Sequence, residues 1–576
     1  MIYILKNDYY FIKNKMATKF EYAKYFPFDT IRNSQRKSIE FILDQFINND
    51  KKFVILEAGT GVGKSAIGVC VSRYMKNYNK DLYKMSQVNE CDNDYVNKSY
   101  ILTTQKILQQ QYVQDYSSNN SSVPDIEDII VSIQSSNNFN CMNNPSMTCG
   151  EVMKQNKREG ENCKLESCDK KCIYKSTKKD FLKSDGVTNF PYFLAQVTYN
   201  SHEFVPRKLL IIDEAHNCDT ELCKFIEILI EDESLKRYNI VMPIHLEEKQ
   251  DLVKWVQKIY LPTLKKLSKD SKDSKNSLQM TKVSKSRLTT ISEELDELDT
   301  TIDKLDKFID NYHEDNWILN KNEFDGNLMN FGFKPIKIDK YADNLLLKYG
   351  ERVLLMSATI IDHKRFCKLN GISIKNSAYL EIPSPFPIEN KPIIFYPVGN
   401  MTKSKINETL PKLVKRINKL LKKHIKDKGI IHCHSYHIGK FIKNNCKYPN
   451  RLLLHHSKNR DKMLDKHGKS TKNTVLLSPS MSEGVDLKDD SSRFQIICKI
   501  PYPYLGDELV MRKRNLWPWW YSYETTKKII QSLGRSIRNE TDFATTYILD
   551  EGWWSFYCEN KKIFPNDFEK QFVKRN

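Results

Sequence analysis

A glycine-rich stretch near the amino terminus has the residue types and spacing that hold a chain of phosphates. It follows the short apolar run Phe53–Glu57 and reads Ala58-Gly59-Thr60-Gly61-Val62-Gly63-Lys64-Ser65. Glycines let backbone N–H groups curl around phosphates, and a helix that starts at this point adds a favourable dipole. Lys64 would reach the β- and γ-phosphates, and the Ser65 hydroxyl would bind Mg²⁺. All eight residues are therefore candidate nucleotide ligands, with Ala58 in place of the glycine of the strict pattern.

Two adjacent acids follow another apolar run, Leu209–Ile212. They are Asp213 and Glu214, in the sequence Asp-Glu-Ala-His. We expect Asp213 to hold Mg²⁺ through the metal's water shell and Glu214 to orient or deprotonate an attacking water. Adjacent acids at the end of a strand are also typical of a solvated surface. The glycine-rich stretch upstream favours the catalytic interpretation and makes both acids part of the predicted nucleotide site.

A third candidate group lies near the carboxyl terminus, where Gln531, Gly534, Arg535 and Arg538 follow the spacing Gln-x-x-Gly-Arg-x-x-Arg. Arginines three residues apart on a helix share a face. Arg535 and Arg538 could therefore act as arginine fingers, which stabilise the charge on a transferring phosphoryl group. Two arginines on a helix are more often simply solvated, but the spacing from Gln531 favours a catalytic role for all three.

The cysteines form a fourth group. The chain has 14 of them, and five fall in one short stretch: Cys141, Cys149, Cys163, Cys168 and Cys172. A disulfide framework is typical of small secreted domains, whereas clustered cysteines in a long intracellular chain more often bind metal. Four thiolates suit an iron–sulfur cluster and structural Zn²⁺ alike. The residues alone leave these two alternatives open.

Composition narrows the classes of partner. The 576 residues include 91 Lys and Arg against 72 Asp and Glu, a formal charge of +19, which favours a polyanion such as nucleic acid or an acidic membrane surface. No run approaches the roughly 18 apolar residues of a membrane-spanning helix. The apolar run at the amino terminus, Ile2–Leu5, is too short for a signal peptide. We therefore expect an intracellular protein, in cytoplasm or nucleus, with no membrane partner.

Continuous apolar runs of strand length indicate the elements that position these motifs. They are Phe53–Glu57, Tyr100–Thr104, Leu209–Asp213, Val353–Ser357, Gly429–His432 and Thr474–Ser478. Such runs, separated by helical stretches, predict parallel strands buried on both faces in a doubly wound α/β fold. Ligands of such folds bind at the carboxyl ends of the strands, where the polar motifs stand.

Two segments interrupt this alternation. One is the cysteine-rich stretch, residues 136–175. The other, residues 217–345, contains a lysine- and serine-rich piece from Ser268 to Arg287, which we expect to be a mobile loop. Heptad spacing from Leu288 to Tyr312 follows it and favours one long helix of an antiparallel pair over a dimerisation zipper.

Taken in order, these motifs resemble those of superfamily 2 helicases of the XPD/DinG family over most of the chain. Arg32 and Gln35 match the adenine-reading segment of that family. The other segments that carry the resemblance are Thr103–Gln105 (motif Ia, which contacts the DNA backbone), Ser357–Thr359 (motif III, which couples hydrolysis to movement), His432–Ser435 (motif IV) and Ser482–Asp486 (motif V). The resemblance implies two RecA-like domains with ATP held between them.

The resemblance also gives the insertions an expected role. In the family, one distant and three close cysteines hold a [4Fe–4S] cluster, which implies Cys141, Cys163, Cys168 and Cys172 as ligands. Zn²⁺ is the alternative, and Cys149 is an extra cysteine that could replace one ligand. Residues 217–345 stand where the family has a mainly helical arch domain, but their sequence matches it poorly.

The expected domain bounds follow from these assignments. They are 18–135, 176–216 and 346–375 for helicase domain 1, 136–175 for the cluster domain, 217–345 for the arch-like insertion and 376–576 for helicase domain 2.

The resemblance implies an ATP-dependent DNA helicase that uses ATP and Mg²⁺, moves 5′→3′ on single-stranded DNA and unwinds forked duplexes. Partner proteins from repair or transcription are possible, and the resemblance does not identify them. The alternatives are a DEAH-type RNA helicase with a zinc-binding cysteine cluster and an inactive nucleic-acid-binding scaffold. Five aromatic residues could stack on bases or pack in the core: Tyr502, Tyr504, Trp517, Trp519 and Trp520.

Overall fold

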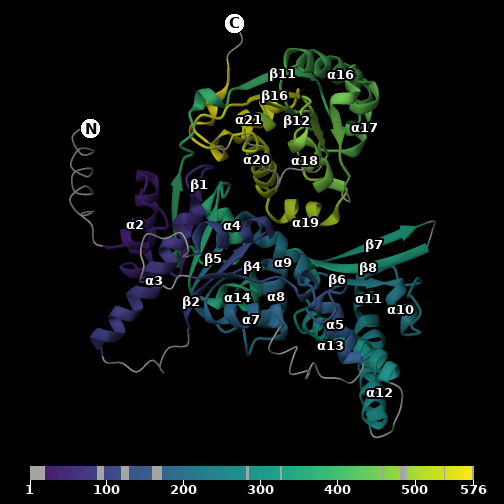
Figure 1. Cartoon of the computed structure of the whole chain (residues 1–576). Coiled ribbons are helices and arrows are strands. Elements are labelled where there is room, and N and C mark those ends of the chain that lie inside the picture. Colours follow the sequence, from purple (N-terminus) through teal and green to yellow (C-terminus); the bar gives the residue numbers. More distant parts are fainter. Residues whose placement is uncertain are drawn as a thin grey trace. The chain divides into compact units, whose positions relative to one another are not determined.

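The computed structural model describes residues 20–86, 96–104, 106–117, 129–158, 172–279, 285–324, 327–456, 459–479, 487, 489–537 and 539–573. The chain forms two compact units, and most of each one surrounds its own parallel sheet (Figure 1). The first unit comprises Met1–Leu56, Lys64–Met356 and Cys367–Leu380. The second comprises Glu57–Gly63, Ser357–Phe366 and Glu381–Asn576. The parallel strands predicted from the apolar runs and the two RecA-like domains implied by the resemblance are thus confirmed, while the predicted domain bounds remain predictions.

A seven-stranded sheet has the order β10-β1-β9-β5-β2-β4-β3. Its strands are β1 (Phe53–Ala58), β2 (Val96–Thr103), β3 (Ile130–Ser132), β4 (Asp185–Asn189), β5 (Arg207–Asp213), β9 (Gly350–Ser357) and β10 (Ser377–Ile382). Every residue of β1 and β5 is buried, as expected for parallel strands covered on both faces. β5 pairs in parallel with β2 and β9, so that Asp213 stands opposite Met356.

The helices that accompany this sheet are α2 (Asn33–Ile47), α3 (Lys64–Ser86), α4 (Lys106–Tyr116), α7 (Ile173–Lys183), α8 (Phe190–Tyr199) and α15 (His363–Leu369). α3 begins at Lys64, directly after the glycine-rich stretch, as predicted. α4 packs against α3, β2, β3 and β4. This packing places one face of α4 close to the carboxyl ends of the central strands.

The sheet of the second unit has six strands in the order β11-β16-β15-β12-β14-β13, all paired in parallel. They are β11 (Ile393–Gly399), β12 (Gly429–His432), β13 (Leu452–Leu454), β14 (Val475–Ser478), β15 (Phe494–Ile497) and β16 (Thr545–Asp550). The helices are α16 (Ile406–Lys423), α17 (Tyr436–Asn445), α18 (Arg460–Lys469), α19 (Glu508–Leu516), α20 (Trp520–Leu533) and α21 (Trp553–Asn560). Apolar residues of α16, such as Leu413 and Ile417, are fully buried against the strands.

The insertion between β5 and β9 contains a helix pair and a small sheet. Its elements are α9 (Cys218–Ile226), β6 (Ile228–Glu231), α10 (Asp232–Arg237), α11 (Lys249–Trp255), α12 (Leu261–Gln279), α13 (Lys285–Asp310), β7 (Trp317–Phe324), β8 (Asn327–Pro335) and α14 (Asp339–Leu345). β6, β8 and β7 form an antiparallel three-stranded sheet, in which β7 and β8 are a long pair (Figure 1). The insertion is mainly helical, as expected, but this sheet was not predicted.

The heptad run forms α13, and α13 pairs with α12. Lys265 binds Asp306 at 2.7 Å, while Ser268 and Lys272 both bind Asp299, at 2.6 and 3.0 Å. Partners therefore run in opposite directions along the two helices, which confirms the antiparallel pair. The expected loop from Ser268 is wrong for residues 268–279, because these residues belong to α12, where Ser268 and Lys272 bind Asp299 of α13.

No helix among the described residues is long and apolar enough to span a bilayer.

Candidate nucleotide-binding site

The turn between β1 and α3 has the backbone conformation that a phosphate loop needs. Gly61 and Gly63 adopt φ of +91° and +87°, in a backbone region that residues with a Cβ rarely adopt. Gly59 N–H donates to Ile382 O at 3.0 Å, and the Ser384 hydroxyl donates to Thr60 O at 2.8 Å. A Cβ on Gly59 would lie 2.8 Å from the Ser384 Cα. Glycine at these positions is therefore required by conformation and by space.

Asp213, at the end of β5, is fixed by hydrogen bonds to both carboxylate oxygens. The Tyr112 hydroxyl of α4 donates to Oδ2 at 2.9 Å, and the Glu214 backbone N–H donates to Oδ1 at 3.0 Å. Ser65, at the start of α3, lies close enough to Tyr112 to lower the pKa of the phenol, which burial raises well above its ordinary value. Tyr112 thus lies beside both residues that were predicted to hold Mg²⁺.

Burial and charge both act on Asp213. Burial and the neighbouring Glu214 charge raise the pKa of its carboxyl to about 6, while the Lys64 ammonium and the Tyr112 hydrogen bond lower it. The structure therefore brings Lys64 near enough to Asp213 for their charges to interact. Ser65 and Asp213 offer oxygen donors, which Mg²⁺ prefers, so this donor set fits the metal.

Glu214 has an unusual backbone. Its φ of 54° lies in the left-handed region, which is sparsely populated for residues other than glycine and is often found at functional sites. Its carboxylate lies 3.3 Å from Nδ1 of the buried His216. The Asp-Glu-Ala-His sequence therefore forms a sharp turn directly after β5, with its side chains held by neighbours.

The predicted adenine-reading residues lie at the start of α2. Gln35 is buried, and its Oε1 accepts the Arg32 backbone N–H at 3.0 Å, which caps the helix. Arg32 is exposed. α2 packs against α3. Gln35 therefore has a capping role in addition to the predicted one.

Residues of motif III form a tight loop after β9. The Thr359 backbone N–H donates to Ser357 Oγ at 3.0 Å, and Gln531 Nε2 lies 3.4 Å from Thr359 Oγ1. The Glu57 carboxylate accepts the backbone N–H groups of Ile360 and Ile361 at 3.1 and 3.0 Å. Ile361 has a φ of +70°, a genuine outlier for a β-branched residue. Glu57 was not singled out in the sequence, although it ends the first apolar run.

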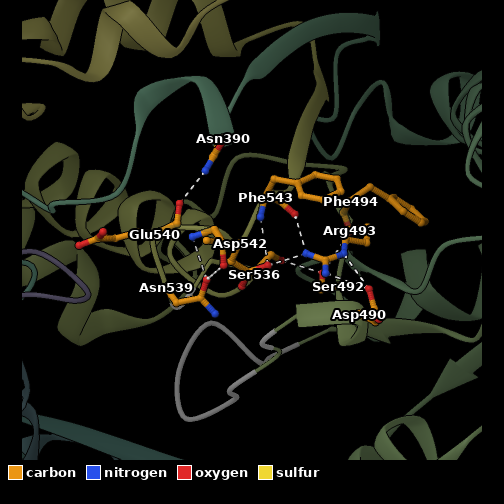
Figure 2. Close-up of polar contacts among 11 residues, drawn as sticks. Asn390, Asp490, Ser492, Arg493, Phe494, Ser536, Asn539, Glu540, Asp542 and Phe543 are labelled. Carbon is orange, nitrogen blue, oxygen red and sulfur yellow. Dashed lines mark hydrogen bonds and ion pairs between the residues drawn. The ribbon is translucent and has the colours of Figure 1, made fainter.

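The predicted arginine helix needs correction. α20 ends at Leu533, where the Gly534 N–H donates back to Ile530 O at 3.1 Å, and Arg535 lies in the turn that follows. The turn is anchored on both sides (Figure 2): Ser536 Oγ lies 2.7 Å from Ser492 Oγ, and Asp542 pairs with Arg493. The helical spacing therefore does not continue to Arg535.

Two histidines of motif IV lie in the same unit as this turn. His432 ends β12, and His434 follows with a φ of 54°. Burial lowers the pKa of His432 to about 4, with a further contribution from the Arg535 charge, and lowers that of His434 to about 3. Both imidazoles are therefore neutral near pH 7.

Three of the clustered cysteines are buried close to one another. An isolated bridge between Asn140 and Thr148 brings Cys141 and Cys149 together, and Cys172 precedes α7. Cys149 Sγ lies 4.0 Å from Cys172 Sγ. Burial, Cys172 and Cys141 together raise the pKa of the Cys149 thiol to about 11. The extra cysteine thus stands with two of the predicted ligands.

The chemistry of these thiols fits a soft metal or an iron–sulfur cluster. Within the described ranges, however, no group of three His, Cys, Asp or Glu residues is arranged to hold a metal ion. Several predicted residues lie outside the described residues: Gln105, Cys163, Cys168, Ser482–Asp486 and Arg538.

The five aromatic candidates divide by exposure. Trp517 and Trp520 are buried, whereas Tyr502 and Tyr504 are exposed. Tyr502 stacks on Tyr521, with ring centroids 5.6 Å apart. Core packing is therefore the role of the two tryptophans.

Comparisons with known proteins agree with this architecture. The chain matches the family model "Type III restriction enzyme, res subunit" over residues 29–242 and "Helicase C-terminal domain" over residues 417–570. A solved XPD helicase structure aligns with 93% of this chain and 98% of its own, at 16% identity and a TM-score of 0.52. The Xpd4 structure from S. tokodaii aligns with 95% and 100%, at 13% identity and a TM-score of 0.54.

Curated relatives match over a shorter stretch. Regulator of telomere elongation helicase 1 homologs from Caenorhabditis elegans and Culex quinquefasciatus are 34% and 29% identical over 101 and 102 residues. These matches cover 15% and 16% of this chain. They span about a tenth of the length of each relative, 10% in both cases.

Proposed function

We propose that this chain, an XPD-like member of helicase superfamily 2, is an enzyme that hydrolyses ATP to move along single-stranded DNA and separate duplexes. The observation that supports this most is that Asp213 lies within reach of the Lys64 charge, with Ser65 next to Lys64 in the chain. These are the side chains that Mg²⁺ and the β- and γ-phosphates of a nucleotide require.

Each side chain has a proposed role in hydrolysis. The backbone of Ala58–Gly63 cradles the phosphates, Lys64 neutralises their charge, and Ser65 and Asp213 hold Mg²⁺. Glu214 orients or deprotonates the attacking water, with His216 fixing its carboxylate. Arg535, Arg538 and Gln531 act on the transferring phosphoryl group, and Arg32 and Gln35 contact the base.

We propose single-stranded and forked DNA as the substrate, with 5′→3′ movement as in the family. The formal charge of +19 supports a polyanionic partner. Because phosphate contacts release counterions, binding of single-stranded DNA should weaken steeply with salt.

We also propose a [4Fe–4S] cluster on Cys141, Cys163, Cys168 and Cys172, with Zn²⁺ as the alternative. Buried thiols bind metal as thiolates, so a cluster would fix the cysteine segment that precedes α7. Anaerobic purification with iron, sulfide and zinc analysis distinguishes the two. About four iron and four sulfide per chain support the cluster, and stoichiometric zinc without iron overturns it.

Lys64→Ala tests the enzymatic proposal. Loss of the ammonium should lower DNA-stimulated ATP turnover on the order of a hundredfold or more, because the charge on the phosphates loses a counter-charge. Affinity for single-stranded DNA should largely remain. Lys236→Ala, which removes an ammonium at an exposed ion pair with Asp232, is the matched control. A wild-type protein that binds DNA and shows no DNA-stimulated ATPase would favour the scaffold instead.

A further inference from the structure

Tyr112 is buried and hydrogen-bonded to the candidate magnesium site. It lies on α4, with 1% of its surface exposed, and its hydroxyl donates to Asp213 Oδ2 at 2.9 Å. α4 is held against α3 and the central strands. The phenol therefore has little freedom to turn away from the carboxylate.

The direction of the hydrogen bonds follows from the number of protons. A phenol has one proton, and that of Tyr112 goes to Asp213. The phenol is therefore the donor to the carboxylate and has no second proton to give to another acceptor.

The Asp213 carboxylate is held on both of its oxygens. Oδ2 accepts from Tyr112 and Oδ1 accepts from the Glu214 N–H, so the carboxylate plane is set before any metal arrives. The remaining lone pairs of both oxygens stay available to a cation.

We propose that Tyr112 is a positioning residue that orients the Asp213 carboxylate for Mg²⁺ and thereby couples metal binding to nucleotide binding. The proposal rests on the proposed ATPase function. When bound, Mg²⁺ would neutralise charge on the β- and γ-phosphates. Tyr112 itself touches neither phosphate nor metal in this account and acts through Asp213.

Tyr112→Phe removes one oxygen and leaves the ring in place. The matched control is Tyr349→Phe, which removes a buried hydroxyl that donates to Val197 O at 3.1 Å in the same unit. The affinity of a fluorescent ADP analogue is measured with Mg²⁺ and with EDTA. Circular dichroism and thermal melting show that both variants remain folded.

The wild type and Tyr349→Phe should bind the analogue more tightly with Mg²⁺ than without it. In Tyr112→Phe the gain from Mg²⁺ should shrink on the order of tenfold, because a hydrogen bond to a charged group is lost, while affinity in EDTA stays unchanged. The Mg²⁺ concentration for half-maximal ATPase should rise by a similar factor. A purely structural role would lower affinity equally with and without Mg²⁺.

Unchanged Mg²⁺ coupling in folded Tyr112→Phe overturns the positioning role. Equal losses in both conditions overturn it as well. If the wild type itself binds no nucleotide, the proposed function fails, and that result is separate from any difference between the variants.

Discussion

Arg493 has two aspartate partners in very different surroundings, and this difference predicts the outcome of two matched substitutions. Asp542 has a fully buried side chain, whereas that of Asp490 is 96% exposed. Figure 2 shows both carboxylates directed at the Arg493 guanidinium. The buried carboxylate also accepts the Phe543 backbone N–H at 3.0 Å. Both aspartates bind the same Arg493 guanidinium. Asp542→Ala and Asp490→Ala therefore remove carboxylates that share a partner and differ in burial.

The expected magnitudes follow from these contacts. Removal of Asp542 loses two hydrogen bonds to a charged group and leaves a guanidinium with only 17% of its side chain exposed. Arg493 keeps Asp490 and the face of Phe543, 4.5 Å from the ring centroid. We therefore expect a loss of about 2–3 kcal/mol rather than the larger value of a fully unpaired buried charge. Removal of the exposed Asp490 should cost about 0.5 kcal/mol or less.

Differential scanning calorimetry of the full chain measures the difference. For a unit of this size 1 kcal/mol corresponds to roughly 2–4 °C, so the transition of the second unit should fall by about 5–10 °C in Asp542→Ala and by less than about 2 °C in Asp490→Ala. Hydrogen exchange should increase at Phe543, because its N–H donates to the Asp542 carboxylate. Equal shifts for the two variants would refute the argument from burial.

Three other predictions concern the remaining features. Burial lowers the pKa of His434 from 6.5 to about 3. Between these two pH values His434 is protonated in the unfolded chain and neutral in the folded chain. The free energy of unfolding of the second unit should therefore fall as pH decreases below 6.5. His434→Gln should flatten that decline by up to about 1.4 kcal/mol per pH unit in urea unfolding at pH 5 and 7, and an unchanged slope would contradict it. Gly61→Ala places a Cβ against the Phe386 ring on a backbone with φ +91°, and it should weaken nucleotide binding at least about tenfold. Gly468→Ala, with open space around it, should leave nucleotide affinity unchanged. Equal nucleotide affinities of the two variants would refute the steric argument. Cys172→Ser should lose bound metal in elemental analysis while Cys446→Ser, a buried thiol bonded to Asn418, keeps it, and retention by both would place the metal elsewhere.

Apolar patterning predicted the central strands because those strands are buried on both faces. It did not predict β4, in which the polar residues Asp185 and Thr188 are buried as well. There the Asp185 carboxylate accepts the Ser99 N–H at 2.7 Å and pairs with Lys76, so polar contacts replace the apolar signal. A pattern of apolar residues does not predict strands that are stabilised by such polar contacts.

The candidate nucleotide site likewise contains residues that the sequence pattern located and one that it did not. Glycine spacing and strand ends located Lys64, Ser65 and Asp213 correctly on their elements, since local chain geometry determines these positions. Tyr112 could not be found, because its contact with Asp213 joins residues 101 positions apart and tyrosine on a helix carries no signal by itself. Arg535 was placed on a helix by its spacing, and the Gly534 at the helix end was the neglected signal.

The large insertion lies in the connection from β5 to β9, which are parallel neighbours in the sheet. Parallel neighbours always need a crossover of a dozen residues or more. Lengthening an obligatory crossover leaves the register of both strands intact, so this segment can acquire helices, strands and new side chains without disturbing the catalytic framework. Changes confined to this crossover would therefore leave Asp213 opposite Met356.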